Sequence, residues 1–167
     1  EWLKFFGETG KIDVVNFRIE HMYGPKDDNN KFVTWLLEQM LSNKDEIRLT
    51  EGVQQRDFVY VTDIVNAYLL VLGKAETFQK FNEYDIGTGN PLPVKEFVLK
   101  LKNTIERIQN KPVTSELQFG SIPYRAGEKM DVAEDLSPLF ALGWRPETNL
   151  EAGLSAMVSE YIARCRR

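Results

Sequence analysis

The chain has 167 residues, of which 43% are apolar and 28% are charged, a composition typical of one globular domain and not of a disordered or fibrous protein. Its net charge of -4, from 21 basic and 25 acidic residues, argues against nucleic acid as a partner, because proteins that bind the phosphate backbone usually carry a basic excess. With one cysteine and one histidine, an internal disulfide is excluded and a metal site is not expected.

The chain shows no signal for membrane association or export. No apolar run approaches the roughly 20 residues that span a bilayer, and the N-terminal EWLKFFGETG lacks the basic start and cleavage site of a signal peptide. We therefore expect a cytoplasmic protein with no membrane partner. The sequence also begins without methionine, inside a helical pattern, and we interpret it as a piece of a longer protein.

Strands and helices alternate in the first half of the chain. We predict a helix at residues 2–8 that Gly10 ends, a buried parallel strand at 12–17, a helix at 30–42, short strands at 47–50 and 55–61, and a helix after residue 61. Thr62 or Asp63 is the expected cap of that last helix. Alternation of this kind is typical of an α/β protein.

The second half continues the alternation. A strand at 82–89 runs into a glycine turn, and it is followed by a helix at 93–108, a strand at 115–120, a short helix at 136–142 and a last helix at 150–163. Asn149 is the expected cap of the last helix. Residues 123–135 show no period, and we interpret them as a functional or bridging loop.

Two arginines are candidate ligand-binding residues. Arg56 precedes an apolar strand, where it either pairs with Asp57 or another acid or binds phosphate, since its planar guanidinium matches paired phosphate oxygens. Arg125 lies on the irregular loop, where it either binds a ligand or pairs with Glu128 or Asp131. From the residues alone, both alternatives stay open.

Two further features are ambiguous. The turn DIGTGN, residues 85–90, could cradle a phosphate with its backbone N–H groups, but it lacks a complete phosphate-loop motif, and a plain turn after a strand is the other interpretation. His21 follows an apolar strand as a possible general base, but it has no recognisable nucleophile motif around it, which favours a ligand hydrogen bond or a structural role.

Five motifs taken together are more informative than any one of them. In chain order they are R-x-x-H-x-Y-G-P at 18–25, EGVQQRDFVYVTD at 51–63, YDIGTG at 84–89, PYRAGE at 123–128 and LGWRPETNLEAGL at 142–154. The series resembles the C-terminal half of the extended short-chain dehydrogenase/reductase family, the NAD-dependent epimerases and dehydratases that act on nucleotide sugars. Where this chain has His21 the family usually has asparagine, and where it has Asp85 asparagine is common.

The resemblance implies a fold and a division of the chain. It implies that residues 1–167 are the C-terminal substrate-binding part of a Rossmann-type α/β protein, with one or two strands of the parallel sheet and several helices. The family's G-x-x-G-x-x-G and Y-x-x-x-K motifs are not found in this sequence. On this reading the N-terminal half that binds NAD or NADP is absent, no catalytic residue lies in the chain, and the fragment alone is not catalytic.

The resemblance also assigns site residues. Arg56 and Arg125 match the two arginines that grip the substrate diphosphate. By position in the motifs, the expected nucleotide or substrate contacts are His21, Asn30, Lys31, Arg48 and Leu49, and the residues expected near the cofactor are Ile19 and Glu20.

The leading hypothesis is that the chain is the nucleotide-sugar recognition portion of an epimerase, dehydratase or reductase of carbohydrate biosynthesis, that is, an isomerase, lyase or oxidoreductase. Its partner is a nucleoside diphosphate sugar, and the intact protein is expected to be a homodimer. One alternative is a non-catalytic ligand-sensing or scaffold module with the same fold. Another is a purely structural domain in which both arginines are committed to ion pairs.

Overall fold

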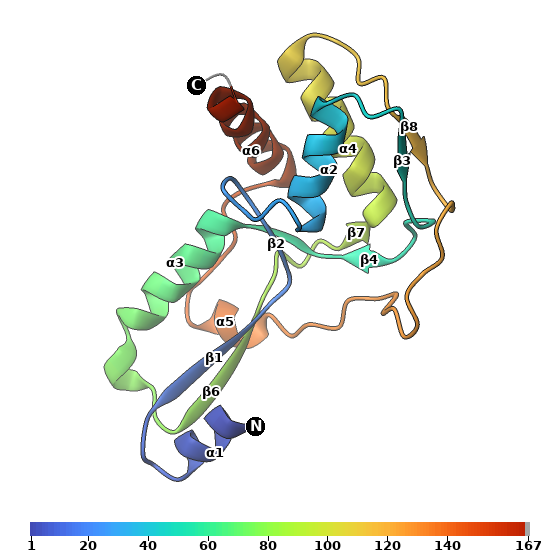
Figure 1. Ribbon diagram of the computed structural model, residues 1–167. Coiled ribbons are helices and arrows are strands. Elements are labelled where there is room, and N and C mark those ends of the chain that lie inside the picture. Colours follow the sequence, from blue (N-terminus) through green and yellow to red (C-terminus); the bar gives the residue numbers. More distant parts are fainter. Residues whose placement is uncertain (166–167) are drawn as a thin grey trace. The chain divides into compact units, whose positions relative to one another are not determined.

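The computed structural model describes residues 1–165, and the chain divides into two compact units (Figure 1). We name the first the sheet unit and the second the helix unit. The sheet unit consists of residues 1–22, 57–90 and 133–148, and the helix unit of residues 23–56, 91–132 and the chain from 149 onward.

The sheet unit is built on two parallel strands. β1 (Val14–Ile19) and β6 (Phe81–Ile86) pair in register from Val14 opposite Phe81 to Ile19 opposite Ile86 (Figure 1). The expectation of one or two parallel strands is confirmed. β1 begins and ends two residues later than the predicted strand at 12–17, and the Asp13 carboxylate just before it accepts the Lys80 N–H at 2.7 Å.

An ion pair connects β1 and β6 near their carboxyl ends. Arg18 lies opposite Asp85, and its Nε and Nη2 atoms donate to the two Asp85 oxygens at 2.5 and 3.0 Å. A side chain that opposes its partner on the neighbouring strand stabilises that register. Asp85, which replaces a common family asparagine, therefore has a structural partner here.

Four helical segments complete the sheet unit. They are α1 (Trp2–Glu8), α3 (Val61–Leu72), the short 3-10 helix η1 (Ala75–Thr77) and α5 (Ser137–Ala141). α1 packs on β1 and β6, and α5 packs on β6. One cluster of its buried core consists of Val59, Ile64, Ala67, Ile86, Leu139 and Trp144.

The start of α3 differs from the prediction that Thr62 or Asp63 caps it. The helix begins at Val61, and in the part of the chain that the structure describes no side chain caps its first turn. Asp63 is buried inside that turn and accepts hydrogen bonds from the N–H groups of Glu147 and Thr148 at 3.2 and 3.1 Å and from the Thr148 hydroxyl at 3.2 Å. Its carboxylate therefore anchors a remote segment instead of its own helix.

The predicted strand at 55–61 is two strands. β4 (Gln55–Arg56) pairs antiparallel with β7 (Leu92–Pro93) in the helix unit, whereas β5 (Phe58–Tyr60) belongs to the sheet unit. Beside β5 lies the start of β2 (His21–Tyr23), whose first N–H, from His21, donates to the Asp57 carbonyl at 2.9 Å. The break falls at Asp57, because that residue turns its side chain toward a different segment.

Three helices form the core of the helix unit. They are α2 (Phe32–Leu41), α4 (Val94–Gln109) and α6 (Leu150–Cys165), and α4 packs against both of the others. Along one face of α4 the apolar residues Phe97, Val98, Leu101 and Ile105 are buried. Two short parallel strands, β3 (Glu46–Arg48) and β8 (Glu116–Gln118), pair beside them.

The predicted cap of the last helix is confirmed. The Asn149 side-chain oxygen accepts the N–H of Ala152 at 2.8 Å, which satisfies one of the free donors at the start of α6.

Among residues 1–165, none of the helices combines the length with the apolar composition that crossing a membrane requires.

The contacts of Asp63 lead to a stability prediction. Replacing Asp63 with Ala should lower the free energy of unfolding by about 1–3 kcal/mol, because the N–H groups of Glu147 and Thr148 would lose a buried acceptor. Chemical denaturation of the variant and of the wild-type chain measures the difference.

The matched control is Thr62→Ala, since Thr62 is the neighbouring exposed position. We expect this change to stay within about 0.5 kcal/mol. A larger loss for Thr62→Ala than for Asp63→Ala would mean that Thr62 caps the helix after all.

Candidate functional site

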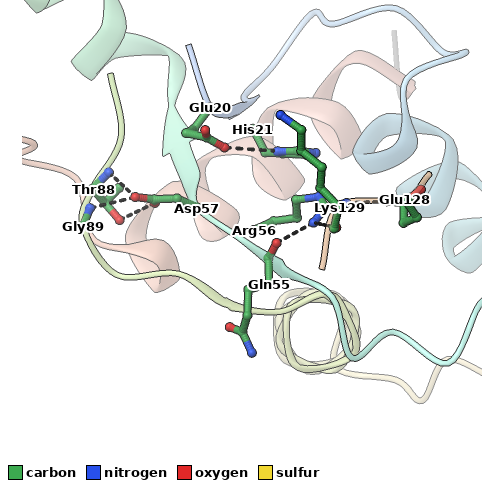
Figure 2. Close-up of polar contacts among 9 residues, drawn as sticks. All are labelled: Glu20, His21, Gln55, Arg56, Asp57, Thr88, Gly89, Glu128 and Lys129. Atoms are coloured by element: carbon green, nitrogen blue, oxygen red, sulfur yellow. Dashed lines mark hydrogen bonds and ion pairs between the residues drawn. The ribbon is translucent and has the colours of Figure 1, made fainter. Parts of the chain in front are cut away.

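Arg56 is nearly buried in the helix unit and is already bonded on several sides (Figure 2). Its side chain is 13% exposed, its Nη1 donates to the carbonyls of Gln55 and Lys129 at 2.6 and 2.8 Å, and its Nη2 pairs with the Glu128 carboxylate. The ion-pair alternative is therefore present in the structure, but the acid is Glu128 and not the adjacent Asp57.

Glu128 connects Arg56 to the turn that carries Arg125. The Glu128 N–H donates to the Arg125 carbonyl at 3.1 Å, and Gly127 has a φ of 77°, so residues 125–128 form a tight turn in which a glycine takes the left-handed position. Arg56 thus binds the last residue of a turn whose first residue is Arg125. Sequence spacing alone gave no indication of this link.

The loop around this turn is fastened along the strand that carries Arg56. The Gln55 N–H donates to the Met130 carbonyl at 2.7 Å, and the Val53 N–H donates to the Tyr124 hydroxyl at 3.2 Å. Residues 124–130 are irregular, as predicted, and these backbone contacts fix their path.

Arg125 differs from Arg56 in its surroundings. Its side chain is exposed, and within residues 1–165 it makes neither of the two ion pairs considered for it, with Glu128 or with Asp131. Glu128 is instead paired with Arg56. Of the two arginines predicted to bind the diphosphate, Arg56 is therefore held by protein atoms, and Arg125 is exposed to solvent.

The remaining predicted contacts in the helix unit lie on two elements. Arg48 ends β3 and donates from Nη2 to the Ser121 carbonyl at 3.0 Å, while the next residue, Leu49, is buried and receives the Ile122 N–H on its carbonyl at 3.3 Å. Both residues thus contact the segment that leads into the Arg125 loop.

Asn30 and Lys31 lie immediately before α2. The Lys31 N–H donates to the Asp28 carbonyl at 2.9 Å, and the Asn30 N–H donates to the Asp28 carboxylate at 3.2 Å. Both side chains are exposed.

Asp57 is the central acid of the sheet unit (Figure 2). Its fully buried carboxylate accepts the Thr88 and Gly89 N–H groups, each at 2.7 Å, and the Thr88 hydroxyl at 2.5 Å. The glycine turn after β6 therefore directs its donors at the protein's own carboxylate. Of the two interpretations of DIGTGN, the structure shows the plain turn, and the phosphate-cradle interpretation is wrong.

The residues predicted near the cofactor lie at the carboxyl end of the parallel pair. Ile19 ends β1, and the Glu20 N–H donates to the Ile86 carbonyl at the end of β6 at 3.0 Å. His21 follows, with its Nδ1 3.8 Å from the Glu20 carboxylate and its ring 5.7 Å from that of Phe58. In open parallel sheets ligands bind beyond this end of the strands.

Sequence reasoning missed Glu134, which lies in a stretch interpreted only as loop. Its Oε2 atom and the Oδ2 atom of Asp57 both pack against Gly87, and burial, followed by the proximity of Asp57, raises the pKa of Glu134 to about 8. Asp57 and Glu134 are far apart in the chain, so no local spacing could have joined them.

Known proteins similar to this chain include epimerases, dehydratases and synthases of nucleotide sugars by name. Residues 1–87 match the model of the NAD dependent epimerase/dehydratase family. CDP-abequose synthase of Salmonella typhimurium is 33% identical over 155 residues, which are 92% of this chain and 50% of that protein. The chain thus spans about half the length of the curated relatives it matches.

Two solved structures have the same fold. A crystal structure of UDP-glucose 4-epimerase with UDP-glucose, from Thermotoga maritima, is 27% identical with a TM-score of 0.79, and the match covers 99% of this chain and 51% of that one. UDP-glucose 4-epimerase of Thermus thermophilus in complex with NAD is 25% identical with a TM-score of 0.77, covering 96% and 50%. The expected α/β architecture of a Rossmann-type protein is confirmed.

The contacts of Asp57 predict a local effect of its removal. Asp57→Asn should lower the free energy of unfolding by about 1–3 kcal/mol and speed amide hydrogen exchange at Thr88 and Gly89, because an amide nitrogen would face backbone donors. Asp131→Asn, at an exposed position, is the control with the same loss of charge. Unchanged exchange at both amides in Asp57→Asn would contradict the assignment of Asp57 as the anchor of the turn.

Proposed function

The chain belongs to the NAD-dependent epimerase/dehydratase family, and from that premise we propose that it is the nucleotide-sugar recognition portion of an NAD(P)-dependent epimerase, dehydratase or reductase. Its ligand in this proposal is a nucleoside diphosphate sugar. The relatives named above include one protein named for a CDP-sugar and one crystallised with UDP-glucose, which supports that ligand class.

The observation that carries the proposal is the link between Arg56 and the turn at residues 125–128. A diphosphate presents oxygens on two phosphorus atoms, and two guanidinium groups can each take one side of it through paired hydrogen bonds. Arg56 is held in one orientation by the Gln55 and Lys129 carbonyls, so little side-chain freedom remains to be lost when a ligand binds.

Arg125 has a complementary part in this proposal. It is exposed and, within residues 1–165, does not form the Glu128 or Asp131 pair, so its charge is available to an anion that approaches from solvent. In the chain without ligand, Glu128 neutralises the charge of Arg56. An incoming phosphate would compete with Glu128 for the Arg56 guanidinium. This competition limits affinity for simple anions and favours a ligand that engages both arginines.

Nucleotide and sugar contacts are assigned to residues of both units, each described within its own unit. Arg48 and Leu49 support the segment that leads to Arg125, and Asn30 and Lys31 present exposed side-chain donors before α2. In the sheet unit, His21 is assigned to the substrate, and Ile19 and Glu20 to the neighbourhood of the cofactor.

In this proposal the chain supplies only part of the cofactor site. When bound, NAD(P) supplies the hydride acceptor and donor of the reaction. The Thr88 and Gly89 N–H groups cannot cradle its diphosphate, since both donate to Asp57, and the residues that fit the cofactor are those at the carboxyl end of β1. No residue of this chain is assigned a catalytic role.

The proposal also includes a cytoplasmic homodimer for the intact protein. α1 exposes large apolar side chains, with Trp2 at 77%, Leu3 at 52% and Phe5 at 53% exposure, which is a favourable composition for a helix that meets another subunit.

Arginine-to-lysine variants test the diphosphate clamp. The folded chain should bind UDP, dTDP, CDP or GDP in calorimetry, and Arg56→Lys or Arg125→Lys should each weaken that binding about 10-fold or more, because lysine keeps the charge but loses the paired donors.

The matched control is Arg107→Lys on α4, whose guanidinium donates to the Ser155 hydroxyl at 2.7 Å. The affinity of the Arg107→Lys variant for the nucleoside diphosphate should equal that of the wild-type chain. Failure of every nucleoside diphosphate to bind the folded chain, or equal affinities for all three variants and the wild type, would refute the clamp.

A further inference from the structure

Four acidic side chains gather in the sheet unit where β1 and β6 end. The carboxyl groups of Glu134 and Asp57 both pack against Gly87, and the charges of Glu20 and Asp85 also act on Glu134. The nucleotide-sugar proposal makes no use of Glu134. We propose that Glu134 is a neutral carboxylic acid in the folded protein, that it donates its proton to the Asp57 carboxylate, and that loss of this proton loosens residues 133–136 from the glycine turn.

The hydrogen bonds of the pair decide which member holds the charge. Three donors converge on Asp57, from the Thr88 and Gly89 N–H groups and the Thr88 hydroxyl. Glu134 Oε2, in contrast, is buried, and no donor group among residues 1–165 forms a hydrogen bond to it. A single negative charge is therefore better placed on Asp57, and the remaining proton belongs to Glu134.

The surroundings oppose a second charge at this point. The Glu20 and Asp85 carboxylates add repulsion to the effects of burial and of Asp57, and together they raise the pKa of Glu134 to about 8. The nearby base Arg18 is committed to Asp85 and Glu83, and His21 lies 3.8 Å from Glu20. Like charges in close contact cannot both ionise without a cost, which is the reason that carboxyl pairs share a proton.

Gly87 provides the space that the pair needs. A Cβ atom at this position would lie 2.1 Å from Glu134 Oε2 and 2.8 Å from Asp57 Oδ2. Both distances are shorter than any real contact of such an atom. A side chain at this position would displace one or both carboxyl groups, so the absence of a Cβ at Gly87 lets them pack side by side.

The proton also has a structural consequence. Residues 133–136 are joined to β6 through the Asp135 N–H, which donates to Asp85 Oδ2 at 2.8 Å, and to the glycine turn through the Glu134 side chain. These residues lead directly into α5. Ionisation of Glu134 would remove one of these two connections and replace it with repulsion from Asp57.

The direction of the pH effect follows from the raised value. The ordinary pKa of a glutamate is 4.5, so the folded chain holds a proton that the unfolded chain releases between 4.5 and about 8. The stabilising effect of that proton is complete below 4.5, declines as the pH rises through this window, and is lost above about 8.

Glu134→Gln tests the proposal, because the amide keeps a donor for Asp57 but cannot titrate. Raising the pH from about 6 to about 9 should lower the melting temperature of the wild-type chain by a few degrees relative to that of the variant. Glu147→Gln, an exposed position in the same unit with the same loss of charge, should follow the wild type. Parallel curves for the wild type and Glu134→Gln would overturn the proposal.

Infrared spectroscopy of the wild-type chain tests the protonation state without any variant. At about pH 7 a neutral carboxylic acid gives a C=O band that carboxylates lack, and ¹³C-labelling of the glutamate carboxyl groups should move it. The band should fade as the pH passes about 8 and should be missing from Glu134→Gln. A wild-type spectrum without the band, or a band that persists in the variant, would overturn the proposal.

Discussion

Two consecutive charged residues, Arg56 and Asp57, are largely shielded from water. The local structure on either side of them depends on the protein groups that bind their charges. Asp57 is fully buried and Arg56 is 13% exposed, so neither charge can rely on solvent, and each must find protein partners. The chain passes from the helix unit to the sheet unit between them. Asp57 fixes the glycine turn after β6, and Arg56 fixes the loop that carries Arg125. One short motif thereby organises a separate segment in each unit.

The proposed diphosphate clamp requires an arginine that already has an acidic partner, Arg56, to bind a ligand as well. The two carbonyl contacts of Arg56 hold its guanidinium in place, while its acidic partner, Glu128, belongs to the turn that begins at Arg125. Movement of that turn would therefore change the position of Arg125 and the ion pair between Arg56 and Glu128 at the same time. In that proposal, a diphosphate that binds both arginines replaces the charge of Glu128 with its own.

Local patterns predicted the parts of the fold that depend on neighbours in sequence. The apolar face of α4, the Asn149 cap and the parallel partners of the first strand follow from periodicity, a capping side chain and β-branched runs. The break of the 55–61 strand could not be predicted, because it depends on donors at Thr88 and Gly89. The same holds for Glu128 and Glu134, whose partners are remote in the chain. The diphosphate role of Arg56 and Arg125 stays a prediction that rests on the family resemblance.

The most direct measurement of the central claim is an NMR titration that follows the side-chain Nε–Hε signals of the arginines as UDP, dTDP, CDP or GDP is added to the folded chain. If the two arginines bind one diphosphate, the signals of Arg56 and Arg125 will move with one common midpoint for at least one of these ligands, while that of Arg107, bonded to Ser155, stays in place. Signals of Arg56 and Arg125 that remain fixed, or that move with different midpoints, would show that the two arginines do not bind one diphosphate.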